Sequence, residues 1–171
     1  MSRHRRNPLP GHRYRAAILW LLLAGASPAG ADLALDPTAA CRLLDDHGLR
    51  TRDGYRDVGQ GVFRCASIGH RLPRASPAPD EAHYAATGDR GRARQLQLDL
   101  ALHSRGDVRA VLDAFAVLAE ALTSRSLGQA LPADARQAIA RGLPGTWRVG
   151  GADLLLERIG GAVPALRFVI R

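Results

Sequence analysis

Leucine alternates with polar residues along residues 94–103, in the most regular hydrophobic pattern of the chain. Every second residue from Leu96 to Leu102 is a leucine. The polar residues beside these leucines are Gln95, Gln97, Asp99 and His103. Because successive side chains of a strand point to opposite faces, the pattern predicts an antiparallel strand with one buried face and one solvated face.

A helical period replaces this alternation over residues 105–126. Seven apolar residues recur there at helical spacing: Val108, Val111, Leu112, Phe115, Leu118, Ala119 and Leu122. Ser104 and Asp107 precede all of them at the spacing of a variant capping box. The segment is therefore expected to form the longest helix of the chain.

Two shorter helices are expected, one on each side of this segment. Asp36 can cap a helix over residues 37–47, which starts with a proline and ends at a glycine. Residues 132–141 begin with proline and stop at Gly142 in the same way.

Short extended segments fill much of the remaining chain. They are residues 62–68, 147–149, 154–159 and 166–170, and paired glycines separate the last three. The order of helix, strands, two helices and strands predicts an α+β fold, with an antiparallel sheet that carries about three helices on one face. Residues 32–171 have the length of a single domain.

Residues 73–92 lack any hydrophobic period. They contain three prolines and two glycines. This composition predicts one long loop between two strands, and a loop of that length in a compact domain is often functional.

The N-terminus has the composition of an export signal. Arginines without acidic residues precede an apolar run over residues 16–24, which is too short to span a bilayer as a helix. Small residues at 29–31 predict cleavage of residues 1–31 before Asp32, by the general secretory pathway, with delivery to the periplasm or the exterior of a bacterial cell. Cleavage at the small residues 24–26 and an uncleaved membrane anchor are the alternatives.

The two cysteines of the chain, Cys41 and Cys65, both follow the signal. In an exported chain an even cysteine count predicts a disulfide, and closing this loop would stabilise the domain by about 3 to 3.5 kcal/mol. Free buried thiols and an intermolecular bridge are the alternatives. A bridge between these residues would tie the first helix to the strand over residues 62–68.

The charge of the mature chain is modest. Five of the 24 basic residues lie in the signal, and nineteen remain against sixteen acidic residues, which leaves a formal charge of +3. Nucleic-acid binding would need a clustered basic surface, so it is not the expected function.

Catalytic motifs are missing from the mature sequence. It has no G-x-S-x-G, no H-E-x-x-H and no phosphate-binding loop, so we expect no catalytic residue, metal site or cofactor. Asp99, His103 and Ser104 are the nearest approach to a catalytic set. Four residues along a strand span about 13 Å, so the carboxylate and imidazole of this set would not meet.

A basic stripe is the strongest candidate for binding. We predict a binding surface with these members: Tyr84, Arg90, Arg92, Arg94, Gln95 and Gln97. A solvated loop without a partner is the alternative. The sequence thus favours an exported, non-enzymatic accessory or binding protein for a protein or acidic polymer. A small hydrolase whose site assembles only in the folded chain is the second possibility.

Overall fold

The computed structural model describes residues 33–72, 79–103 and 108–171. Within these ranges the chain forms one antiparallel sheet of eight strands. Its strands are β1 Arg56–Gly59, β2 Val62–Ala66, β3 His70–Arg71, β4 Glu81–Gly88, β5 Ala93–Ala101, β6 Gly145–Val149, β7 Ala152–Ile159 and β8 Ala165–Ile170. The helices are α1 Pro37–Arg42, the short 3-10 turn η1 Asp45–His47, α2 Arg109–Leu127 and α3 Ala133–Arg141.

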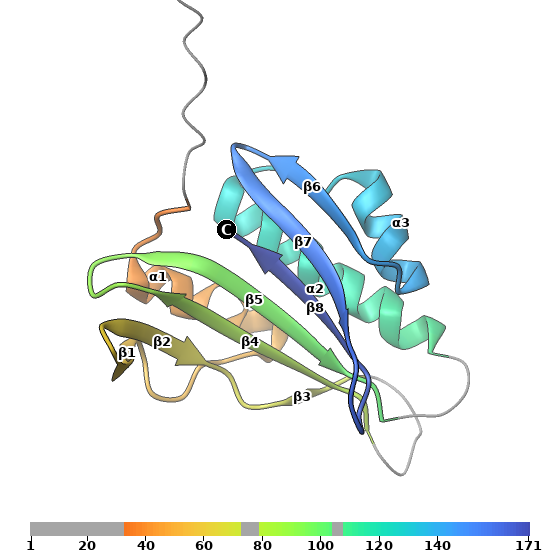
Figure 1. Cartoon of the computed structure of the whole chain (residues 1–171), viewed down its shortest axis with the longest axis horizontal. Coiled ribbons are helices and arrows are strands. Elements are labelled where there is room, and N and C mark those ends of the chain that lie inside the picture. The colour runs from red at the N-terminus through yellow and green to blue at the C-terminus, as the bar shows by residue number, and fades with distance from the viewer. Residues whose placement is uncertain (1–32, 73–78, 104–107) are drawn as a thin grey trace, which may run out of the picture.

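The strand order is β1-β2-β4-β5-β8-β7-β6, and β3 pairs with β4 beside this path. The helices lie behind the sheet in Figure 1, and the opposite face is open toward the viewer. The predicted α+β fold, with an antiparallel sheet and three helices on one face, is therefore confirmed.

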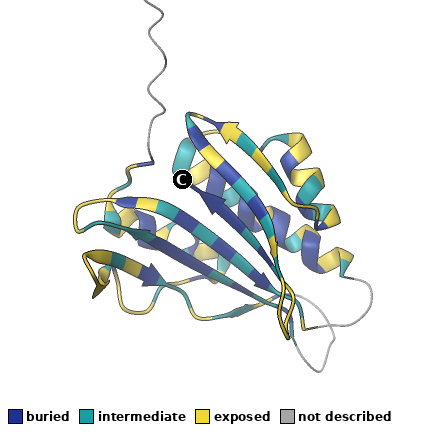
Figure 2. Cartoon of the chain, in the orientation of Figure 1, coloured by how far each residue is buried: buried dark blue, intermediate teal, exposed yellow. Residues whose placement is uncertain are grey.

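The core lies between the sheet and the helices. Leu98 of β5 pairs with Phe168 of β8, and both side chains are fully buried beneath the helical layer, as is Phe115 of α2. Figure 2 shows buried residues alternating with less buried residues along β5 and β7. The alternating leucines of residues 94–103 therefore identified the core face correctly.

The open face is polar at its centre. Asp99 pairs in register with Arg167 of β8, and Arg167 pairs in register with Glu157 of β7. The Arg167 Nε donates to Asp99 Oδ1 at 2.8 Å, and Gln97 Nε2 donates to Asp99 Oδ2 at 2.6 Å. Cross-strand pairs thus satisfy much of this polar surface within the molecule.

The predicted cysteine pair is present. Cys41 and Cys65 form a disulfide with Cα atoms 6.0 Å apart, and both residues are buried. The bond joins α1 to β2, as the sequence predicted. It crosslinks the first helix to the sheet from the core side.

The long loop predicted at residues 73–92 is wrong, because Glu81–Gly88 forms β4 in the middle of the sheet. Its buried side chains include three alanines and one tyrosine: Ala82, Ala85, Ala86 and Tyr84. Alanine has a low preference for strands and contributes little to a hydrophobic pattern, so the segment carried no strand signal. Long-range pairing with β2 and β5 creates this strand.

The expected helices differ in their bounds. Residues 37–47 divide into α1 and the separate turn η1, and α2 begins at Arg109. The proposed capping residues Ser104 and Asp107, and the predicted signal at residues 1–31, lie outside the described residues. Within the described ranges, none of the helices has the length and hydropathy to cross a membrane.

Candidate binding surface at the basic end of the sheet

Arginines gather where the β1–β2 hairpin meets the β4–β5 turn, at the left of Figure 1. We call residues 50–64 and 89–94 the basic end. These residues include seven arginines, all exposed, and three aspartates. The rest of residues 32–171 holds twelve arginines and thirteen acidic residues. The excess positive charge of residues 32–171 is therefore concentrated at the basic end.

Strand pairing brings these two segments together. Phe63 of β2 pairs with Gly88, the last residue of β4, so the hairpin lies beside the turn that follows. A Cβ atom at Gly88 would lie 2.1 Å from the Arg92 carbonyl oxygen and 2.8 Å from the Tyr55 hydroxyl. Only glycine leaves room for this close approach.

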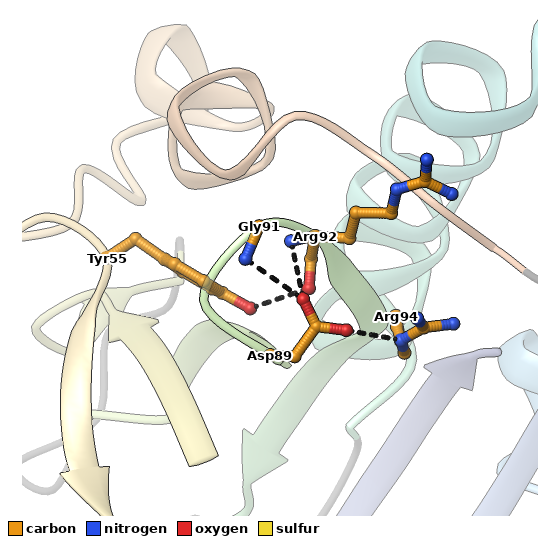
Figure 3. A network of polar contacts seen from close by, with 5 residues as sticks. All are labelled: Tyr55, Asp89, Gly91, Arg92 and Arg94. Atoms are coloured by element: carbon orange, nitrogen blue, oxygen red, sulfur yellow. Dashed lines mark hydrogen bonds and ion pairs between the residues drawn. The ribbon is translucent and has the colours of Figure 1, made fainter. Parts of the chain in front are cut away.

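Asp89 organises the turn. Its Oδ1 accepts hydrogen bonds from the backbone nitrogens of Gly91 at 2.9 Å and Arg92 at 3.0 Å, and its Oδ2 accepts one from Arg94 Nε at 2.8 Å (Figure 3). The Arg94 side chain, followed by the Gly91 amide, lowers the pKa of the Asp89 carboxyl group. Asp89 is therefore the anionic centre of a rigid turn.

Aromatic rings attach the hairpin to this turn. The Tyr55 hydroxyl donates to the Arg92 carbonyl oxygen at 3.0 Å, and the Tyr55 ring stacks on Phe63 with centroids 5.9 Å apart. The Arg90 guanidinium lies 5.8 Å from the centroid of Phe63 on the ring face. Such cation–π contacts restrict an exposed arginine and so hold its charge in place.

All three aspartates of the basic end are engaged locally. Asp53 pairs with Arg56 at 2.9 Å, Asp57 Oδ1 accepts from the Gly59 nitrogen at 2.7 Å, and Asp89 holds the turn. Among the described residues, five arginine side chains of the basic end have no acidic partner: Arg50, Arg52, Arg64, Arg90 and Arg92. Figure 3 shows the Arg92 guanidinium directed away from Asp89.

Five of the predicted site residues lie on the β4–β5 turn and along β5. Arg90 and Arg92 are exposed on the turn, while Arg94 is exposed but committed to Asp89. Gln95 lies half-buried at the start of β5. Gln97 lies two residues further along, on the open face, where its amide is bonded to Asp99.

Tyr84 is not a surface residue, so its predicted binding role is wrong. Its side chain is 1% exposed, and its hydroxyl donates to the Ala40 carbonyl oxygen at 2.6 Å. This burial raises the pKa of the hydroxyl well above its usual range. The error follows from the missed strand, because the alternation along β4 places Tyr84 on the buried face together with Ala82 and Ala86.

Two exposed valines of the hairpin were missed. Val58 is 55% exposed and Val62 is 43% exposed, next to the arginines of the same hairpin. The glycines on either side of Gln60 signalled a reversal, but only the pairing of β1 at the sheet edge shows that these valines stay uncovered. Arginine and aromatic residues around an exposed apolar centre are typical of protein interfaces.

In the structure, Asp99 of the possible catalytic set is bonded to residues outside that set. Asp99 Oδ1 accepts a hydrogen bond from Arg167 and Asp99 Oδ2 accepts one from Gln97, while the backbone nitrogen of His103 donates to the buried carboxylate of Asp80 at 2.7 Å. Ser104 lies outside the described residues. In the described part of the chain, no group of three or more histidines, cysteines or acids is placed to hold a metal ion.

Comparison with known proteins found no matching family model, and neither a curated protein nor a solved structure matched the chain. Function is therefore argued from the geometry of the basic end.

Proposed function

We propose that the chain is an exported, non-enzymatic binding protein whose basic end contacts an acidic segment of a partner protein. The observation that carries this proposal is the coincidence of unpaired arginines and uncovered valines on one hairpin and its neighbouring turn. Charge would guide the encounter, and Val58 with Val62 would supply the apolar contact.

The turn is organised for such a contact before a partner arrives. Asp89 and Tyr55 fix the backbone that carries Arg90 and Arg92, and Phe63 restricts the Arg90 side chain. A fixed arginine loses less conformational freedom on binding and can present its planar donors to a carboxylate. This arrangement favours a protein partner over a purely diffuse attraction to polymer charge.

A charge-reversal experiment tests the proposal. The probe is a fluorescent ten-residue polyglutamate peptide, titrated with the mature chain at low and physiological salt. The variant R90E/R92E should bind at least tenfold more weakly than the wild type and with a smaller salt dependence, because two exposed charges are lost at the contact.

The matched control is R148E/R171E, which changes the net charge equally beside β6 and the start of β7. It should retain binding within about twofold. Equal losses in both double variants would show a net-charge effect and contradict a binding surface at the basic end. Tighter binding of single-stranded DNA than of the peptide would contradict a protein partner.

Export is part of the same proposal. The disulfide between two buried cysteines supports it, since such bonds persist in oxidising compartments. Mass spectrometry of the chain secreted from a bacterial host should show an N-terminus at Asp32. A secreted or membrane-retained chain that still contains Trp20 would contradict cleavage.

A further inference from the structure

A second surface feature lies at the opposite end of β5 from the basic end. There a cavity of about 360 Å³ opens between the start of α2, the end of α3 and the β7–β8 hairpin. Its apolar lining residues are Leu102, Val108, Leu112, Ile159, Pro164 and Leu166. The volume falls at the lower end of the range of small-molecule sites, which is about 300 to 1,000 Å³.

Two arginines from different elements border this apolar space. Arg141 is the last residue of α3, and Arg158 lies near the end of β7. The Arg158 Nε donates to the Gly142 carbonyl oxygen at 2.6 Å, which holds the guanidinium across the end of α3. A Cβ atom at Gly142 would lie only 3.2 Å from Arg158 Nη2.

Among the described residues, no acidic side chain compensates the positive charge of the cavity. No aspartate or glutamate is among its described lining residues, and Arg141 has no hydrogen-bond or ion-pair partner in the described part of the chain. Asp113 lines the adjoining groove between α2 and α3, which Arg141 also borders. A ligand that filled the cavity with apolar atoms alone would leave both guanidinium groups without an anionic partner.

We infer that this cavity binds a single-chain amphiphile with an anionic head group, such as a fatty acid or an alkyl phosphate. The alkyl chain occupies the apolar space, and the head group pairs with Arg141 and Arg158. Guanidinium groups bind carboxylate and phosphate oxygens through paired, charge-assisted hydrogen bonds, which an alcohol head group cannot match. The inference is independent of the basic end.

Calorimetric titration of the mature chain tests the inference. The probes are decanoate, decyl phosphate and decyltrimethylammonium, each below its micelle concentration, and decanol below its solubility limit. One anionic probe should bind with a stoichiometry of one, at least tenfold more tightly than decanol, and the cationic probe should not bind. The tighter of the two anions identifies the head group. Equal binding of decanol and both anions, or no binding of either anion, would overturn the inference.

Two variants separate the charge from the cavity. R141Q should weaken anion binding about tenfold and leave decanol binding unchanged, and retained decanol binding shows that the cavity is intact. R148Q, at the far end of β6, is the matched control and should bind as the wild type does. L112F should weaken all ligands, because the larger ring enters the cavity. Anion binding by R141Q equal to that of the wild type would overturn the pairing.

Discussion

The centre of the sheet and its basic end are held by different interactions. At the centre, Leu98 and Phe168 are fully buried, and they bring together strands that are far apart in the sequence. At the basic end, exposed side chains hold the turn around Asp89, and Tyr55 joins this turn to the hairpin through the Arg92 carbonyl oxygen. The fold therefore depends on the centre, while the residues of the basic end can change with little cost to stability. A surface whose side chains can change without loss of the fold is suited to binding.

The largest expected effect is at the centre. Replacing Phe168 with alanine removes a fully buried ring and should lower the free energy of unfolding by about 3 to 5 kcal/mol. The control Q95A changes a half-buried residue of the neighbouring strand. Its free energy of unfolding should stay within about 0.5 kcal/mol of the wild-type value. Urea unfolding followed by circular dichroism measures both. A similar loss in the two variants would remove the contrast between the regions.

Loss of the disulfide, which lies between the two regions, should have the next largest effect on the free energy of unfolding. The double variant C41A/C65A should lower the free energy of unfolding by about 3 kcal/mol, because the unfolded chain regains the freedom of a loop closed over 24 positions. Reduction of the wild type should reproduce this loss, and the double variant should not respond to reductant. An unchanged unfolding midpoint after verified reduction would show that the bond contributes no stability.

A smaller effect is expected for Tyr84. Y84F removes the hydrogen bond to the Ala40 carbonyl oxygen and should cost about 1 kcal/mol. Because burial raises the pKa of this hydroxyl, the folded state retains its proton when the unfolded state loses one above about pH 10. The wild type should therefore lose stability as pH rises above 10, and Y84F should lose less. Parallel pH profiles for both proteins would contradict this assignment.

The sequence predicted the centre better than the basic end, for a physical reason. The leucines of residues 94–103 repeat with the period of a strand, so they identified β5, its buried face and the α+β class. Tyr84 was misplaced because its strand is rich in alanine and forms only through β2 and β5. The basic end joins residues that are more than 30 positions apart, such as Tyr55 and Arg92, and no local pattern predicts that contact.

The smallest effect on stability is expected at the turn. Arg94 lowers the pKa of Asp89, so R94Q should raise that pKa toward 3.8, the ordinary value of an aspartate. A depressed carboxyl pKa stabilises the fold above the pKa of the unfolded state, and the contribution is lost as pH falls. Because both groups are exposed, the midpoint of urea unfolding at pH 7 should not change. Carboxyl-carbon NMR titration measures the pKa, and an unchanged value in R94Q would show that another group causes the shift.

The central claim is that an acidic protein segment binds at the basic end, and NMR mapping of the amides tests it most directly. Addition of the ten-residue polyglutamate peptide to nitrogen-15-labelled mature chain should shift the amides of residues 56–64 and 89–94. Amides of α2 and β7 should stay in place, and R90E/R92E should lose the shifts while keeping its folded spectrum. Shifts confined to the open face or to the helices would contradict the account, as would an unchanged response in the double variant.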